Sequence, residues 1–168
     1  EDNFIGPLPQ PNAPAAGWAE FWRDRRLEPQ LRRARDAGHS PGPPADWERL
    51  FARLPGLLAP AERDGSSLLH GDLWSGNVVA GAGGEPWLVD PAAYRGHREV
   101  DLAMAGLFGG FSARFHAAYA EAWPLLPGYP EGRRAVYQLY YLLVHVVLFG
   151  GGYVERTRAA LREALRAA

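Results

Sequence analysis

A polar loop between two short apolar runs places the strongest constraint on how this chain folds. The loop is His70-Gly71-Asp72-Leu73-Trp74-Ser75-Gly76-Asn77, and it follows the apolar end of Ser66-Ser67-Leu68-Leu69. Gly71 and Gly76 permit a tight bend, and a glycine-rich turn over residues 81–84 separates Val78-Val79 from Trp87-Leu88-Val89. The pattern predicts a short β-hairpin unit over residues 66–90 that returns Asp90 to the side of Asn77.

Asp72, Asn77 and Asp90 have the residue types and the spacing of a phosphoryl-transfer site. An aspartate, an asparagine five residues later and a second aspartate after an apolar run repeat the layout of a catalytic loop followed by a metal-binding aspartate. A carboxylate at Asp72 can accept or orient the proton of an attacking hydroxyl. The Asn77 amide oxygen and the Asp90 carboxylate are ligands suited to Mg²⁺. These residues predict a kinase that uses ATP and Mg²⁺, with Asn77 and Asp90 binding both.

The run Asp72-Leu73-Trp74-Ser75-Gly76-Asn77, with the segment from Leu88 to Met104, resembles the fructosamine (ketosamine) kinase family, relatives of the aminoglycoside phosphotransferases. Other segments resemble the family in the same order: Asp2-Asn3-Phe4-Ile5-Gly6, Pro9-Gln10-Pro11-Asn12, Arg25-Arg26-Leu27, Pro29-Gln30-Leu31 and Phe108-Gly109-Gly110-Phe111. The resemblance implies a protein-kinase-like fold and phosphorylation of a sugar hydroxyl on a ketosamine, as in protein deglycation. The partner that it implies is a small sugar-amine or a glycated protein.

Four more residues are candidates for the site. Trp74 lies in the polar loop and is assigned to acceptor binding, because the C–H faces of sugars stack on indole; the resemblance points the same way. His70 is expected to brace the loop rather than act as the base. His145 is a satisfied core histidine on generic grounds, whereas the resemblance implies that it faces the sugar. Asp101 is either a carboxylate favoured in the first turn of a helix or, by resemblance, an acceptor of hydrogen bonds from the catalytic loop.

Composition restricts the class of protein further. The 168 residues, 47% of them hydrophobic, suffice for one domain with a real core. A net charge of −1 argues against nucleic acid or a membrane surface as the main partner. The absence of cysteine excludes disulfides and thiolate metal sites and fits a cytoplasmic location. The oligomeric state stays open.

All eighteen basic residues are arginines. Kinases of this type hold the ATP phosphates with a lysine from an N-terminal lobe, and no such lysine exists here. The first residue is Glu1 rather than methionine. We therefore expect residues 1–168 to be a single domain, the C-terminal lobe of a kinase whose nucleotide-binding lobe lies upstream. Residues 1–14 are then expected to be an extended connector from that lobe.

The remaining pattern predicts a mostly α-helical α+β lobe around the small antiparallel hairpin. Helices are expected over 17–35, from an N-cap at Asp46 to Leu54, over 98–108, from a cap at Ser112 to Trp123, over 131–149 and over 153–167. Residues 56–65 and 91–97 read as loops, and residues 98–168 as a helical subdomain. The arginines of the first helix are expected on a solvated face.

Three alternatives remain open from the sequence. One is an aminoglycoside or choline-like acceptor for the same kinase chemistry. Another is a metal-dependent phosphoesterase, which would need a histidine where Val78 stands. The third is a non-catalytic binding lobe, because the phosphate-binding lysine is absent.

Overall fold

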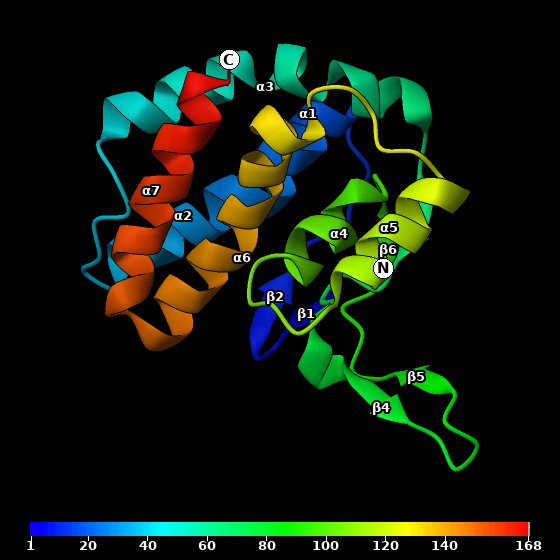
Figure 1. Cartoon of the computed structure of the whole chain (residues 1–168). Helices are drawn as coiled ribbons and strands as arrows, with labels where there is room; N and C mark the ends of the chain where they lie inside the picture. The colour runs from blue at the N-terminus through cyan, green and yellow to red at the C-terminus, as the bar shows by residue number, and fades with distance from the viewer. Residues whose placement is uncertain (168) are drawn as a thin grey trace.

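The computed structural model describes residues 1–167 and is mostly helical, with three two-stranded antiparallel sheets (Figure 1). The elements, in chain order, are β1 (Asn3–Ile5), β2 (Leu8–Gln10), α1 (Trp18–Phe21), η1 (Trp22–Leu27), α2 (Glu28–Asp36), α3 (Pro44–Asp64), β3 (Ser67–Leu69), η2 (Ser75–Asn77), β4 (Val78–Ala80), β5 (Pro86–Leu88), β6 (Tyr94–Gly96), α4 (Glu99–Ala105), α5 (Ala113–Ala122), η3 (Tyr129–Arg133), α6 (Arg134–Phe149) and α7 (Gly152–Arg166). This arrangement confirms the predicted mostly helical fold with small antiparallel sheets.

Helix α6 is the centre of the core. From Leu139 to Val144 every side chain is buried, because the helix is apolar on all sides. Helices α2, α4 and α7 pack against it, so helices from before and after residues 66–90 share one hydrophobic core. The prediction of a buried core helix at this position is confirmed. None of the helices in the described part of the chain has the length and apolar character needed to cross a membrane.

The first predicted helix is continuous from α1 through η1 to α2, but η1 is a π-helical segment that the sequence did not indicate. Trp22, Leu27 and Leu31 are buried, as their spacing predicts. The prediction of a solvated arginine face is wrong at Arg26, whose side chain is fully buried. Its guanidinium lies 4.0 Å from the ring centre of Tyr94 and donates to the carbonyl of Pro11.

Helix α3 corrects two predictions. It runs to Asp64, although Pro55, Gly56 and Pro60 led us to expect a loop after Leu54. Leu54, Leu58 and Ala61 extend the buried stripe, and their burial outweighs the poor helix propensity of the prolines and the glycine. The helix begins at Pro44, so Asp46 lies inside its first turn and is not the N-cap.

The strands of the 66–90 region belong to two different sheets. Strand β3 pairs with β6, which lies in the segment predicted as a loop, with Leu68 opposite Arg95. Strands β4 and β5 form the predicted hairpin, with Val79 opposite Trp87. Figure 1 shows this hairpin projecting away from the helices. Its projection leaves Val79, Trp87 and Leu88 exposed.

Most of the remaining elements are of the type that the sequence predicts, but their bounds differ from the prediction. Residues 1–14, expected as a connector, contain the β1–β2 hairpin. Helix α4 ends at Ala105 rather than at Phe108. Ser112 caps α5 as predicted, since its hydroxyl accepts a hydrogen bond from the Phe115 amide. The helix predicted over 131–149 consists of η3 and α6, and the one over 153–167 is α7.

Candidate active site

The loop between β3 and β4 carries the predicted catalytic residues. It leaves β3 at Gly71, whose φ is +80°. A Cβ atom at Gly71 would lie 2.1 Å from the carbonyl oxygen of Ala92, so only glycine permits the loop to approach the segment after Asp90 this closely. Tyr141 of α6 donates a hydrogen bond of 2.9 Å to the Gly71 carbonyl and attaches the loop to the core.

The side chain of Asn77 joins the two aspartates. Its Nδ2 donates to the Asp72 carbonyl at 2.9 Å, and lies 3.4 Å from Asp72 Oδ2 and 3.5 Å from the carbonyl oxygen of Asp90. The backbone amide of Val89 donates to the carbonyl of Asn77 at 3.0 Å. The hairpin therefore returns Asp90 to the side of Asn77, and the three residues share one small region.

Asp72 lies in surroundings that disfavour its charge. Burial raises the pKa of the Asp72 carboxyl above its ordinary range, and the hydrogen bond from Asn77 opposes part of that rise. The negative charge of Asp90 also raises this pKa slightly. A carboxylate held less acidic than usual is a better proton acceptor.

Asp90 has a left-handed backbone conformation and an exposed side chain. Its φ of +52° is the only left-handed value of a non-glycine residue in the described chain. Such conformations are uncommon outside glycine and concentrate at functional sites. The residue is exposed, and its carboxylate accepts no hydrogen bond from residues 1–167. The carboxylate is therefore available to a ligand from outside the chain.

His70 and Asp101 hold the start of the loop. The Asp101 carboxylate accepts hydrogen bonds from the backbone amides of His70 and Gly71, at 2.8 and 2.9 Å. Burial raises the pKa of Asp101, and these two hydrogen bonds oppose part of the rise. His70 Nδ1 faces the amide of Asp72, and its Nε2 lies 3.0 Å from the carbonyl of Val89. Protonation of the ring on Nε2 satisfies both contacts.

Asp72 opens onto a cavity of about 370 Å³ with aromatic walls. Trp74 and His145, the two predicted acceptor-binding residues, both line this cavity. Asp101, in the first turn of α4, does not. Sequence reasoning gave no role to the other lining side chains, which include Phe108, Tyr141, Phe149 and Tyr153. Among the lining residues, Ile5, Met104 and Phe108 had a signal only through the segments of the family resemblance.

His145 and Trp74 are both positioned by their neighbours. His145 Nδ1 lies 2.8 Å from the Tyr141 carbonyl and must donate to it, which leaves Nε2 as an acceptor. Burial lowers the pKa of His145 and favours this neutral ring. The indole of Trp74 lies over Gly76, where a Cβ atom would approach it to 2.2 Å. The cavity thus offers an indole face, an imidazole acceptor and a carboxylate.

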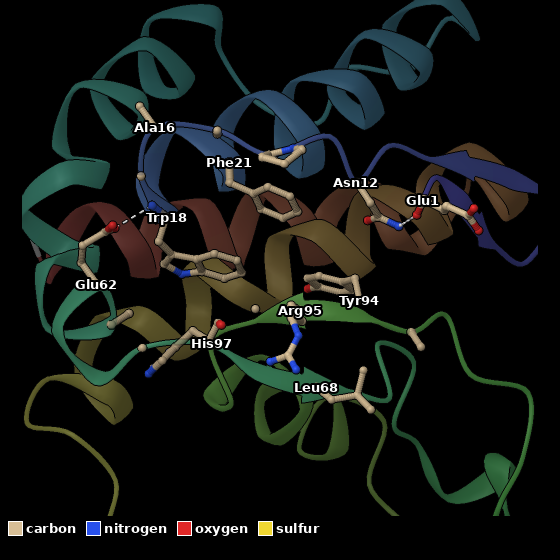
Figure 2. A pocket seen from close by; sticks show the side chains of 18 residues that line it. Glu1, Asn12, Ala16, Trp18, Phe21, Glu62, Leu68, Tyr94, Arg95 and His97 are labelled. Carbon is tan, nitrogen blue, oxygen red and sulfur yellow. Dashed lines mark hydrogen bonds between the residues drawn. The ribbon is translucent and has the colours of Figure 1, made fainter.

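A larger cavity of about 670 Å³ contains none of the predicted site residues (Figure 2). Figure 2 shows Trp18, Phe21 and Tyr94 around it, with Glu62 accepting a hydrogen bond from the Trp18 amide. It has no group resembling the Asp72–Asn77–Asp90 arrangement. The cavity beside Asp72 is smaller, but it is the one that contains predicted site residues, and we take it as the candidate site for that reason.

The side-chain oxygens of Asn77 and Asp90 are suitable ligands for Mg²⁺. Asn77 is buried, and its Oδ1 accepts no hydrogen bond from residues 1–167, although its Nδ2 makes three contacts. An amide oxygen and a carboxylate are hard ligands of the type that Mg²⁺ prefers. Within the described residues, no three His, Cys, Asp or Glu side chains form a metal-binding cluster. These two residues alone would leave most of the Mg²⁺ coordination sphere to phosphate and water, as is usual for this ion.

The fold and the loop together define a mostly helical unit of kinase-like type. The family model described as "Fructosamine kinase" matches residues 1–167. The chain therefore belongs to the fructosamine kinase family.

Individual relatives agree with this assignment. A probable ketoamine kinase of Synechocystis is 44% identical over 98% of this chain and 54% of its own length. The ketosamine-3-kinase of Mus musculus is 40% identical over 88% of this chain and 47% of its own length. A crystal structure from Thermobifida fusca, assigned by inference as a fructosamine-3-kinase, superposes with a TM-score of 0.87 at 41% identity, covering 98% of this chain and 57% of that one. The chain thus spans about half the length of these relatives, matching their C-terminal portion.

Proposed function

We propose that this chain is the acceptor-binding and metal-binding lobe of an ATP-dependent ketosamine kinase, which phosphorylates a sugar hydroxyl of a sugar-amine adduct. The observation that carries the proposal is the convergence of Asp72, Asn77 and Asp90, together with the cavity that Asp72 lines with Trp74 and His145. The names of the relatives, ketoamine and ribulosamine kinases, support a glycated small molecule or protein as the acceptor.

Each residue has a role in this proposal. The acceptor sugar stacks its C–H face on Trp74, and a hydroxyl donates to His145 Nε2. Asp72 accepts or orients the proton of the reacting hydroxyl. Asn77 and Asp90 hold Mg²⁺, while His70 and Asp101 keep the loop in place. When bound, Mg·ATP supplies the γ-phosphoryl group and neutralises the charge that spreads over it during transfer.

The proposed location is the cytoplasm, as the composition suggests. Relatives from rice and Arabidopsis carry the name "Protein-ribulosamine 3-kinase, chloroplastic", so the family is not confined to one compartment. Imaging of a tagged protein in its own cells would test the location.

An acceptor screen with Mg·ATP tests the function. Because residues 1–168 contain no lysine to hold the phosphates, this screen and the turnover assays of the variants use the chain fused to the upstream lobe of a relative. The acceptors are a fructose–lysine adduct, free fructose, an aminoglycoside and choline, and ADP release is measured for each. We expect the ketosamine to give at least about tenfold higher kcat/KM than the others, a difference of about 1.4 kcal/mol. Preference for the aminoglycoside or choline would overturn the acceptor assignment. Turnover that Asp72→Asn leaves unchanged would overturn the assignment of the site.

A further inference from the structure

The segment after Asp90 is held by two amide side chains from the other end of the chain. Gln10 Nε2 donates to the Ala92 carbonyl at 3.0 Å, and Asn3 Nδ2 donates to the Ala93 carbonyl at 2.7 Å. Both amides belong to the β1–β2 hairpin, more than eighty residues away in sequence. Two successive carbonyls are therefore fixed from outside their own segment.

The orientation of both amides is determined by their partners. Gln10 is fully buried, its Oε1 accepts a 2.6 Å hydrogen bond from the Tyr140 hydroxyl, and its Nε2 also donates to Asn3 Oδ1. A carbonyl oxygen can only accept, so the side facing Ala92 must be the NH₂ group. Every polar atom of the Gln10 side chain is used, and none remains for a substrate.

The buried guanidinium of Arg26 is linked to these amides by hydrogen bonds through Asn12. Arg26 Nη2 donates to Asn12 Oδ1 at 2.7 Å, and Asn12 Nδ2 donates to Asn3 Oδ1 at 2.9 Å. Figure 2 shows Asn12 also donating to the carbonyl of Glu1. Hydrogen bonds that begin at a charged donor are stronger than neutral ones and polarise the bonds that follow. The chain from Arg26 through Asn12 to Asn3 ends on the Ala93 carbonyl.

The Ala92 carbonyl is also the atom against which the catalytic loop packs. It occupies the space that a side chain at Gly71 would need. Ala92 lies two residues after Asp90, whose own carboxylate has no partner within residues 1–167. The position of Asp90 relative to Asp72 therefore depends on where this backbone is held, and Gln10 and Asn3 hold it.

We propose that Gln10 and Asn3 are positioning residues for the metal ligand Asp90. The inference rests on the proposed function, because it assumes that Asp90 binds Mg²⁺. Loss of either amide lets the Ala92–Ala93 backbone shift, which weakens metal binding. Ile5 and Gly6 of the same hairpin line the acceptor cavity, and the backbone pairing of Ile5 with Leu8 does not depend on either amide side chain. Partners that orient a ligand from outside the coordination sphere change metal affinity by about 10- to 100-fold.

The test measures Mn²⁺ binding by the electron paramagnetic resonance of free Mn²⁺, in the presence of a non-hydrolysable ATP analogue. The protein is the chain fused to the upstream lobe of a relative, because residues 1–168 contain no lysine to hold the phosphates. Gln10→Met keeps the side-chain length and removes both donors; Asn3→Ala is a second variant at a less buried position. The matched control is Gln138→Met, since Gln138 also donates to a backbone carbonyl, that of Ala103, far from Asp90 in sequence. Asp90→Asn defines the signal that belongs to the site.

We expect Gln10→Met and Asn3→Ala to weaken Mn²⁺ binding about tenfold or more, and Gln138→Met to change it less than about twofold. The Mg²⁺ concentration for half-maximal turnover should rise in parallel, with the KM for the acceptor unchanged. If Asp90→Asn abolishes binding while Gln10→Met behaves like Gln138→Met, positioning by the amides is overturned and the proposed function stands. If Asp90→Asn leaves Mn²⁺ binding unchanged, both fail.

Discussion

At the scale of single residues, Asp72 combines two properties that a catalytic carboxylate needs. It is partly buried, which raises its pKa, and it still reaches the cavity where the acceptor is proposed to bind. Because the folded pKa lies above the unfolded one, ionised Asp72 destabilises the fold at every pH above the folded pKa. That destabilisation disappears as the pH falls through the folded pKa towards the unfolded one.

The first prediction is that Asp72→Asn separates activity from stability. Phosphotransfer should fall by about 10²- to 10⁴-fold, because the proton acceptor is lost. Thermal unfolding at pH 7 should occur at the same or a higher temperature than in the wild type, and this advantage should vanish in acid. Turnover and melting temperature measured from pH 4 to 8 check both effects. A variant that melts well below the wild type at pH 7 would contradict this account.

Trp74 gives the second prediction. Its indole is 40% exposed and lies over Gly76 at the cavity wall. Trp74→Ala should raise the KM for the acceptor by about tenfold, since an aromatic contact of this kind contributes about 0.5–1.5 kcal/mol. ATP hydrolysis without acceptor should change less than about twofold. An equal loss of both in steady-state assays would show that Trp74 supports the loop and not the acceptor.

The sequence predicted the residues of the loop because their spacing is local. Asp72 and Asn77 are five positions apart, and a predicted hairpin connects them with Asp90. Gln10, Asn3 and Tyr141 had no such signal, because their partners lie 70 to 90 residues away and the contacts form only after the core has assembled. The sequence also left two roles undecided. For His145 the alternatives were a core histidine and a residue facing the sugar, and for Asp101 they were a carboxylate in the first turn of a helix and an acceptor of hydrogen bonds from the loop.

At the scale of elements, a buried ion pair joins α4 to the end of η3, directly before α6. Glu99 and Arg133 are both fully or almost fully buried, and two hydrogen bonds of 2.9 and 3.2 Å connect them. Arg133 also donates to the carbonyls of Leu126 and Pro127, so the pair fixes the connection that follows α5. The lone pairs of the carboxylate are satisfied as well, since Leu126 donates its amide to Glu99.

The third prediction concerns this pair. Glu99→Gln should destabilise the protein by about 3–5 kcal/mol, because it leaves the charge of Arg133 buried without its counter-ion. Glu163→Gln is the matched control, since Glu163 forms an exposed pair with Arg134 at 2.9 Å. The control should cost less than about 1 kcal/mol. Urea unfolding of both variants measures the difference, and similar midpoints would contradict the assignment.

The β4–β5 hairpin gives the fourth prediction. It is a two-stranded unit that projects from the helices, with its apolar side chains exposed and Pro86 unable to donate a hydrogen bond. Such isolated hairpins are marginally stable. Its amides should exchange with deuterium at least about 100-fold faster than those of Leu139–Val146, where opening requires loss of the core. Residue-resolved hydrogen exchange tests this, and equal protection would show an unrecognised contact.

The prediction of secondary structure failed for two elements. In α3 the burial of apolar side chains outweighed the low helix propensity of proline, and β6 is a short strand with a distant partner. Prolines in α3 suggested a loop, yet Leu54, Leu58 and Ala61 keep one buried stripe. Strand β6 was missed because Tyr94-Arg95-Gly96 is only three residues long and pairs with β3 across the twenty-four residues of intervening loop and hairpin. The helix around Leu139 was predicted correctly because it is apolar on every side.

At the scale of the whole molecule, the helical lobe has one core, yet it matches only about half of its relatives. The fifth prediction is that residues 1–168 alone turn over ATP close to background. Positioning of the phosphates supplies most of the rate in this chemistry, and no lysine in the chain can hold them. Fusion to an upstream lobe of a relative should restore ADP release. Full turnover by residues 1–168 would contradict this requirement.

The proposed acceptor cavity is lined by side chains of several elements, including Ile5 of β1 and Met104 of α4. Asp72 and Trp74 come from the loop after β3, whereas His145, Phe149 and Tyr153 come from the junction of α6 and α7. Under the proposed function, substitutions at that junction would reshape acceptor recognition without touching Asn77 and Asp90. In evolutionary terms such a unit would be modular, and a new specificity would require changes to one helical corner rather than a new catalytic apparatus.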